Sequence, residues 1–125
     1  MMCEGEATVR YAADAGPVTL EIRSGYATIG NYRACIDEDN TWPEFGNGSL
    51  SDSIPDIHVI PIAGTALESH TVLIVGNYAP PSTDPQVRVI YEFRQGSAVL
   101  ETVTIQEKPD GYVSCSHMIY FEARS

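Results

Sequence analysis

One acidic stretch, residues 37–55, concentrates the side chains of this sequence that are best suited to binding a ligand. It reads DEDNTWPEFGNGSLSDSIP, and it includes Trp42, the only tryptophan of the chain. Turn-forming residues and acids dominate it, and the period-two alternation of its surroundings stops. A connection of this length is uncommon unless it is functional. We therefore predict a functional or ordered surface loop here.

Carboxylates in the acidic stretch are spaced closely enough to share a cation. Calcium takes six to eight oxygen ligands, and carboxylates of flexible loops commonly supply several of them. The favoured interpretation is an acidic loop that binds only water and counterions. The alternative is a calcium site formed by Asp37, Asp39, Glu44 and Asp52, without the regular spacing of an EF-hand loop.

Aromatic side chains in the same stretch suggest a second kind of site. Sugars bind to exposed aromatic platforms flanked by polar groups, and the candidate ligand-binding residues are Trp42, Glu44 and Phe45. A single loop tryptophan more commonly closes the end of a β-sandwich, because burying its large side chain is favourable. The sequence thus favours a buried Trp42, with an exposed platform as the alternative.

Ser114-Cys115-Ser116-His117 contains the residue types of nucleophilic catalysis. Residues two apart on a strand point the same way, so Cys115 and His117 are expected on the apolar face. This placement predicts an inert core thiol and a hydrogen-bonded interior or rim histidine. Cys35 and His58 could add zinc ligands, but no CxxC or HxxxH spacing supports such a site. We assign no catalytic residue.

Short β-strands must position all of these residues. The chain has 11 Ile and 10 Val against 5 Leu, a choice that suits a pleated, half-buried surface. Period-two alternation predicts strands over residues 8–13, 18–23, 26–36, 56–62, 87–94, 99–107 and 113–123, and a run that is apolar on both faces predicts one over residues 71–75. Gly30 suggests a bulge, residues 65–68 fit a capping box with one short helical turn, and residues 71–75 suit a central strand.

About eight strands at short spacing predict an all-β fold. A single open sheet would leave an apolar face in water, so we expect one antiparallel β-sandwich domain over residues 1–125. Immunoglobulin-like, C2-like and jelly-roll topologies all fit this pattern, and a small barrel is the lesser alternative.

The charge balance excludes several classes of partner. The chain of 125 residues carries 17 acids and 7 bases, for a net charge of −10. Nucleic acids and anionic membranes require basic patches, which this sequence lacks. Neither Lys nor Arg occurs between Arg33 and Arg88, an interval that holds eight acids. Such an interval indicates a solvated acidic surface, a cation site or a basic partner.

Cysteine usage and the first residues bear on the compartment. Three cysteines are few and odd in number, so we predict that all three are unpaired and that the compartment is reducing. The first residues lack the pattern of a signal peptide, and no run of 18 apolar residues occurs. The sequence predicts a cytoplasmic protein if the chain is full length, and a secreted one if a signal was removed.

These observations favour a non-catalytic binding module. The first hypothesis is protein–protein interaction or assembly through the acidic stretch or an edge strand, including homo-oligomers by edge-strand contact. The alternative is a carbohydrate-binding module, assisted by calcium. A small hydrolase is the third hypothesis, and it would require two carboxylates across a cleft or an exposed His117. No cofactor other than Ca²⁺ is expected.

Overall fold

The computed structural model describes residues 1–25, 28–50, 54–81 and 85–124. The described residues form nine strands and one 3-10 helix, in the order β1 (Met2–Ala12), β2 (Thr19–Gly25), β3 (Ile29–Ile36), β4 (Glu44–Leu50), β5 (Asp56–Val59), η1 (Gly64–Ser69), β6 (Thr71–Ala79), β7 (Val87–Gln95), β8 (Ala98–Glu107) and β9 (Val113–Arg124). Within these residues, no helix has the length and apolar character needed to cross a membrane.

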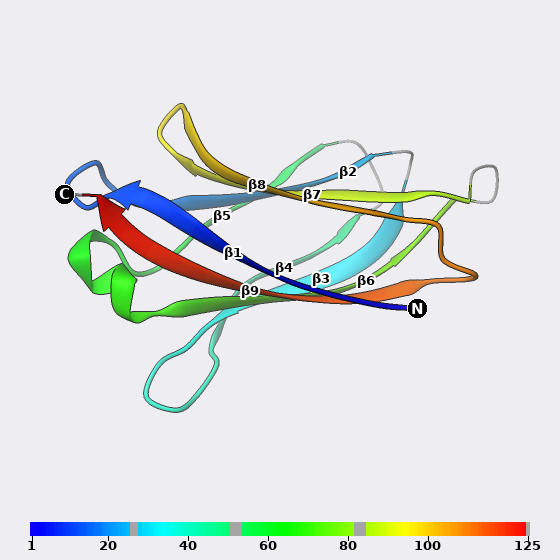
Figure 1. Ribbon diagram of the computed structural model, residues 1–125, viewed down its shortest axis with the longest axis horizontal. Coiled ribbons are helices and arrows are strands. Elements are labelled where there is room, and N and C mark those ends of the chain that lie inside the picture. The colour runs from blue at the N-terminus through cyan, green and yellow to red at the C-terminus, as the bar shows by residue number, and fades with distance from the viewer. Residues whose placement is uncertain (26–27, 51–53, 82–84, 125) are drawn as a thin grey trace.

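The strands form two layers that pack face to face (Figure 1). One sheet has the strand order β1-β9-β6-β3-β4, and the other has the order β5-β2-β7-β8. The prediction of an all-β sandwich is confirmed. β6 is central in its sheet, as predicted, and β5, which is followed by Pro61, lies at an edge.

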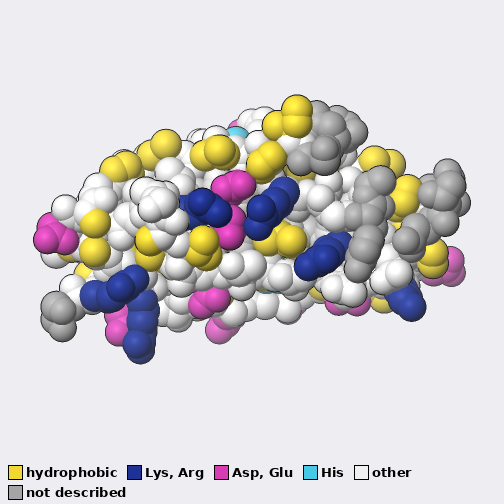
Figure 2. Space-filling view, turned by 90° about the horizontal axis from the view of Figure 1, so that it is seen from above, with side chains coloured by type: hydrophobic (Ala, Val, Ile, Leu, Met, Phe, Trp, Pro, Cys, Tyr) yellow, Lys and Arg dark blue, Asp and Glu magenta, His cyan; other side chains and the backbone are white. Residues whose placement is uncertain are grey.

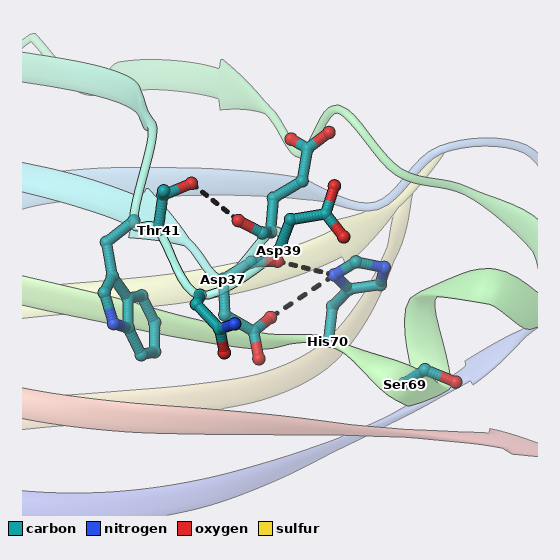
Figure 3. Close-up of a pocket in the computed structure, with 8 residues that line it drawn as sticks. Asp37, Asp39, Thr41, Ser69 and His70 are labelled. Carbon is teal, nitrogen blue, oxygen red and sulfur yellow. Dashed lines mark hydrogen bonds and ion pairs between the residues drawn. The ribbon is translucent and has the colours of Figure 1, made fainter.

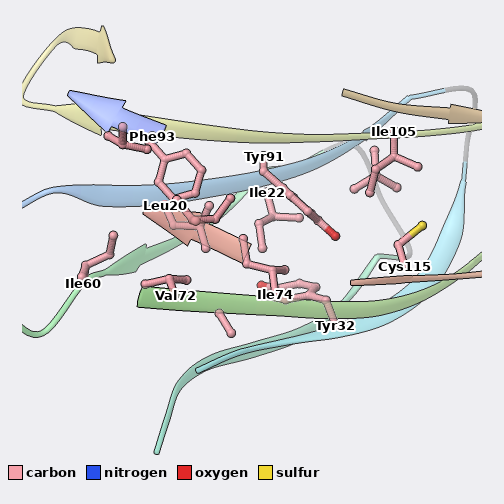
Figure 4. Packing of buried hydrophobic residues seen from close by; sticks show 14 of the residues in the cluster. Leu20, Ile22, Tyr32, Ile60, Val72, Ile74, Tyr91, Phe93, Ile105 and Cys115 are labelled. Carbon is pink, nitrogen blue, oxygen red and sulfur yellow. The ribbon is translucent and has the colours of Figure 1, made fainter. Parts of the chain in front are cut away.

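Alternating side chains from both layers fill the space between the sheets (Figure 4). Leu20 and Ile22 of β2 and Phe93 of β7 are fully buried, and they meet Val72 and Ile74 of β6. Alternation therefore placed the core correctly, because successive strand residues point to opposite faces of a sheet.

The prediction of purely antiparallel pairing is wrong at one edge. β1 pairs with β9 in parallel, from Met2 opposite Ser114 to Ala12 opposite Arg124. Parallel neighbours need a long crossover rather than a hairpin, and here the whole chain between them supplies it. Alternation reports which side chains face inward but not the direction of a neighbouring strand, so the sequence did not reveal this pair.

The acidic stretch is not one long loop, because β4 occupies its middle. β4 pairs with β3, and its inward positions are Gly46, Gly48 and the buried Leu50. A Cβ atom on Gly46 would lie 2.7 Å from the ring of His58, and one on Gly48 would lie 2.5 Å from Asp56 Oδ2. These glycines interrupt the alternation, so that β4 resembles a loop in the sequence. The same glycines leave the space in which β5 approaches β4.

Two local predictions also need correction. The bulge of β3 lies between Ala34 and Cys35 rather than at Gly30, which keeps regular pairing with Tyr78. The predicted short helical turn exists as η1, but its N-cap is Ala63 and no side chain caps it. Leu67 anchors this helix instead, since its side chain is completely buried.

The prediction of three unpaired cysteines is wrong. Cys3 and Cys115 form a disulfide across the parallel pair, with their Cα atoms 4.5 Å apart, and buried Cys35 is the remaining free thiol. The two bonded residues lie directly opposite each other in the β1–β9 register. That register is a tertiary feature, and Cys3 lies before the first strand that alternation predicted.

The outer face of the four-stranded sheet carries a network of charges (Figure 2). Arg23 lies 3.3 Å from Glu92, and Arg94 lies 3.1 Å from Glu92 and 3.4 Å from Glu21. The network leaves Glu92 only 6% exposed. Two of the few cations of the chain are thus paired on this face.

Candidate functional site

The loop between β3 and β4 is the tip of a β-hairpin. Glu38 and Thr41 exchange backbone hydrogen bonds of 2.9 Å in both directions. Between them, Asp39 and Asn40 have φ values of +48° and +65°. Positive φ at both central residues is the mark of a type I′ turn, and Asp and Asn tolerate that conformation. The tip is therefore defined by local hydrogen bonds, and it projects from the body of the sandwich (Figure 1).

A surface pocket of about 400 Å³ lies against this tip, and we call it the loop pocket (Figure 3). Its volume is within the range of small-molecule sites. Its walls come from the β3–β4 loop and from the end of η1 with the residue that follows it. The lining residues are Asp37, Glu38, Asp39, Asn40, Thr41, Trp42, Ser69 and His70.

Hydrogen bonds tie the two walls of the loop pocket together. The backbone N–H of Thr71 donates to Asp37 Oδ1 at 2.7 Å. His70 Nδ1 lies 2.7 Å from the carbonyl oxygen of Asp37, to which it donates, and 3.3 Å from Asp37 Oδ1. Sequence reasoning missed Ser69 and His70, because only the pairing of β3 with β6 brings them beside Asp37.

Trp42 is 43% exposed and lines the loop pocket, so the favoured prediction that it is buried is wrong. The hairpin tip carries it beyond the last β3–β4 pair, Cys35 with Glu44. The structure therefore exposes the indole, as the alternative requires.

The structure brings only part of each predicted set together. Asp37 and Asp39 line the loop pocket, but Glu44 does not. Its carboxylate accepts a hydrogen bond from Asn47 Nδ2 at 2.7 Å and lies 3.8 Å from Arg33. Phe45 packs against the hydrophobic core and is not part of the pocket either.

Asp52 lies outside the described residues. Over the part of the chain that the structure describes, no group of three or more His, Cys, Asp or Glu residues is arranged to hold a metal ion. Among the predicted calcium ligands that the structure describes, Asp37 and Asp39 line the loop pocket and Glu44 lies outside it, and the calcium site stays a prediction.

A second polar cluster joins β3 of one sheet to β5, an edge strand of the other. Tyr32 Oη lies 2.8 Å from Asp56 Oδ2, to which it donates, and 2.5 Å from His58 Nε2. Burial and the neighbouring Asp56 carboxylate raise the pKa of Tyr32 far above its ordinary value. Tyr32 thus stays protonated and acts as a structural link between β3 and β5.

The Ser114 to His117 segment does not form a catalytic site. Cys115 is bonded to Cys3, and the side chains of Ser114 and Ser116 point away from His117 because they alternate with it along β9. His117 is 7% exposed and packs edge-to-face against Tyr91 with ring centroids 5.6 Å apart. Its predicted interior position is confirmed, but Nδ1 has no hydrogen-bond partner among the described residues.

Burial lowers the pKa of His117 below its ordinary value, which makes folding sensitive to acid. Because the unfolded chain binds a proton more readily here, stability should be complete above about pH 6.5 and should fall as pH drops below it, by at most about 1.4 kcal/mol per pH unit. We expect His117→Phe to flatten this dependence by close to one proton. Urea unfolding of both proteins from pH 7.5 to 4.5 measures the difference, and parallel curves would contradict it.

The loop pocket is a recess formed by residues of the acidic stretch together with Ser69 and His70. It combines an exposed indole, three carboxylates and several neutral polar groups. Comparison with known proteins finds no matching family model, curated protein or solved structure. The chemistry of the pocket is thus the basis on which function can be inferred.

Proposed function

We propose that this chain is a non-catalytic binding module that holds a basic segment of a partner protein in the loop pocket. The observation that carries the proposal is the exposed indole of Trp42 beside the carboxylates of Asp37, Glu38 and Asp39. A lysine or arginine side chain can lie over an indole face while its charge meets carboxylates, and both contacts are favourable.

Electrostatics support a cationic ligand. The lining residues of the loop pocket include neither Lys nor Arg, and the chain as a whole carries a charge of −10. Arg23 and Arg94 are paired with carboxylates on the outer face of the other sheet. An acidic surface of this kind raises the association rate of a basic partner, most strongly at low salt.

A neutral oligosaccharide is the second candidate ligand, since the same exposed Trp42 could stack on a sugar ring. Asn40, Thr41 and Ser69 line the pocket and offer neutral hydrogen-bonding groups. The two candidates differ in salt dependence, because screening weakens charge contacts much more than stacking and neutral hydrogen bonds.

Calorimetric titration with a lysine hexapeptide and with neutral glucose oligosaccharides tests the proposal. We expect the peptide to bind and its affinity to fall as salt rises from 20 to 200 mM. Trp42→Ala should weaken binding about fivefold, in line with roughly 1 kcal/mol for a cation–π contact. The separate variant Asp39→Asn should also weaken peptide binding, because it removes one negative charge from the pocket.

Matched controls lie elsewhere on the surface. Tyr112→Ala removes an aromatic side chain that is 59% exposed and outside the pocket, and Asp110→Asn removes one charge. Both controls should bind like the unaltered protein. Equal losses in Trp42→Ala and Tyr112→Ala would overturn the proposal, and salt-independent binding of the oligosaccharide alone would favour the second candidate.

Calcium binding stays a prediction with its own test. If Asp37 and Asp39 help to hold Ca²⁺, calcium at a hundredfold its Kd should stabilise the folded state by about 2.7 kcal/mol. The melting temperature should then rise by roughly 10 °C over that measured with chelator at equal ionic strength. The Asp37→Asn, Asp39→Asn double variant should lose this rise. An unchanged melting temperature would show that the calcium prediction is wrong, and the basic partner would remain as the proposed ligand of the acidic loop.

The Cys3–Cys115 disulfide bears on where such a module would work. Disulfides persist in oxidising surroundings and are rare in the reducing cytosol. We infer that the chain works in an oxidising compartment, which favours the secreted alternative of the sequence analysis.

A further inference from the structure

The outer face of the five-stranded sheet is hollowed along β9. In the first half of β9 the outward side chains are Ser114 and Ser116, which are small and lie between β1 and β6. Side chains in one row of a sheet point the same way, so small residues on the middle strand leave a recess between their neighbours. This recess has a volume of about 480 Å³, and we call it the β9 groove. Its lining residues are Glu4, Gly5, Glu6, Leu73, Ser116 and Met118.

The β9 groove combines an apolar part with an acidic wall. Leu73 and Met118 lie directly opposite each other in the β6–β9 pair, and both are half-buried. Glu4 and Glu6 are exposed and line the groove from β1. Among the residues that the structure describes, neither of these two carboxylates has a basic partner within 4 Å. The groove therefore offers an apolar contact and negative charge to the same ligand.

Two arginines on the same outer face are paired with other acids. Arg33 Nε on β3 lies 3.8 Å from Glu44 Oε1, and Arg10 Nε on β1 lies 3.8 Å from Glu122 Oε1. Neither arginine lines the β9 groove. The bases of this face are thus engaged outside the groove, and charge complementarity favours a cationic ligand within it.

A short series of contacts connects the β9 groove with the loop pocket. The backbone N–H of Thr71 donates to Asp37 Oδ1 of the loop pocket at 2.7 Å. Thr71 lies directly opposite Tyr120 of β9. Tyr120 is 39% exposed, and its Oη donates to Glu6 Oε1 of the groove at 3.5 Å. The two recesses therefore belong to one continuous surface of the five-stranded sheet.

The strand register sets the separation between the acids of the two recesses. Asp37 lies beside Thr71, and Thr71, Tyr120 and Thr8 follow one another across β6, β9 and β1. Glu6 is two residues before Thr8. The Cα atoms of Asp37 and Glu6 are therefore about 16 Å apart by ordinary strand spacing and rise. An extended chain covers about 13 Å in four residues, and flexible lysine side chains can span the remainder.

We propose that the basic segment of the partner is extended and continues from the loop pocket into the β9 groove. A second cation of the segment meets Glu4 and Glu6, and an apolar side chain between the two cations packs on Leu73 and Met118. This inference rests on the proposed function, because the loop pocket supplies the first contact. The partner segment therefore has a cation, an apolar residue and a second cation at alternate positions, all on one face. Joining the two contacts by a short chain makes the second one intramolecular and strengthens binding.

Two capped pentapeptides test the groove by calorimetric titration at low salt. The first has lysine at positions one and five, leucine at position three and serine elsewhere, and the reference peptide has glutamine in place of the second lysine. We expect the unaltered protein to bind the two-lysine peptide about fivefold more tightly, as for one added ion contact. Ser116→Leu fills the groove without changing charge, and the Glu4→Gln, Glu6→Gln double variant removes its acids. Each should reduce this ratio below twofold and leave the affinity for the reference peptide within twofold.

Matched controls lie outside both recesses. Ser49→Leu adds the same bulk to exposed β4, and the Asp14→Asn, Asp110→Asn double variant removes two exposed acids. Both controls should keep the fivefold ratio, and circular dichroism checks that every variant is folded.

The outcomes separate the groove from the loop pocket. A ratio near one in the unaltered protein, or a fivefold ratio that persists in the groove variants, would overturn the groove. So would an equal loss of the ratio in the groove variants and the controls. In each of these cases the proposed function stands as long as Trp42→Ala weakens the binding of both peptides. If Trp42→Ala weakens neither, the proposed function fails, and with it the inference that rests on it.

Discussion

Gly30→Ala is expected to lower the melting temperature by roughly 15 °C, through a loss of about 4 kcal/mol in the free energy of unfolding. A Cβ atom at this position would collide with the carbonyl oxygen of Asn77 and lie 2.9 Å from Tyr78 Cα, both backbone atoms of the paired strand. Gly30 also has a φ of +153°, which a side chain disfavours. Because neither neighbour is a flexible side chain, β3 and β6 would have to separate.

Gly96→Ala is the matched control for this experiment. Gly96 also has a positive φ, +61°, but nothing lies within 4 Å of an added Cβ atom there. Gly96→Ala should therefore lower the free energy of unfolding only through the strain of a side chain at positive φ, by about 1 to 2 kcal/mol. Thermal and urea unfolding followed by circular dichroism measure both variants. Equal losses would mean that the approach of β3 to β6 is not what requires glycine at position 30.

Loss of the Cys3–Cys115 disulfide is expected to destabilise the protein by about 4 to 5 kcal/mol. The two cysteines are 112 residues apart, so the crosslink restricts nearly the whole unfolded chain. Loop-closure entropy for about 100 residues gives roughly 4.7 kcal/mol, and native disulfides commonly contribute 2 to 5. The Cys3→Ala, Cys115→Ala variant should therefore unfold at a much lower urea concentration than the oxidised protein.

Reductant and thiol counting supply the controls for the disulfide. In the presence of reductant, the stability of the unaltered protein should fall to nearly that of the double variant. The stability of the double variant should not change with reductant. Cys35→Ala removes a buried thiol without opening a crosslink and should have a much smaller effect. Denatured without reductant, the unaltered protein should expose one free thiol, that of Cys35. A count of three would contradict the disulfide.

Local pattern was sufficient to predict the two-layer β fold and most of its core. Ile22, Phe93 and Ile119, for example, are buried where alternation placed them. Alternation works because successive strand residues face opposite sides, so the sequence records which face lies in water. The sequence also located the acidic stretch and, in Asp37, Asp39 and Trp42, part of the loop pocket, because charge and composition are local properties.

The partners of each strand and of each side chain were decided only by the tertiary structure. β4 escaped prediction because Gly46 and Gly48 make room for His58 and Asp56, a requirement that comes from another sheet. Ser69 and His70 join the loop pocket through the pairing of β3 with β6.

Cys3 and Cys115 meet through a parallel register that no turn between them specifies. Pairing over such separations depends on how whole sheets pack and on the direction of neighbouring strands. Periodicity along one strand contains no information about sheet packing or about the direction of a neighbouring strand. For this reason the sequence alone determined the layers but not the contacts between distant residues.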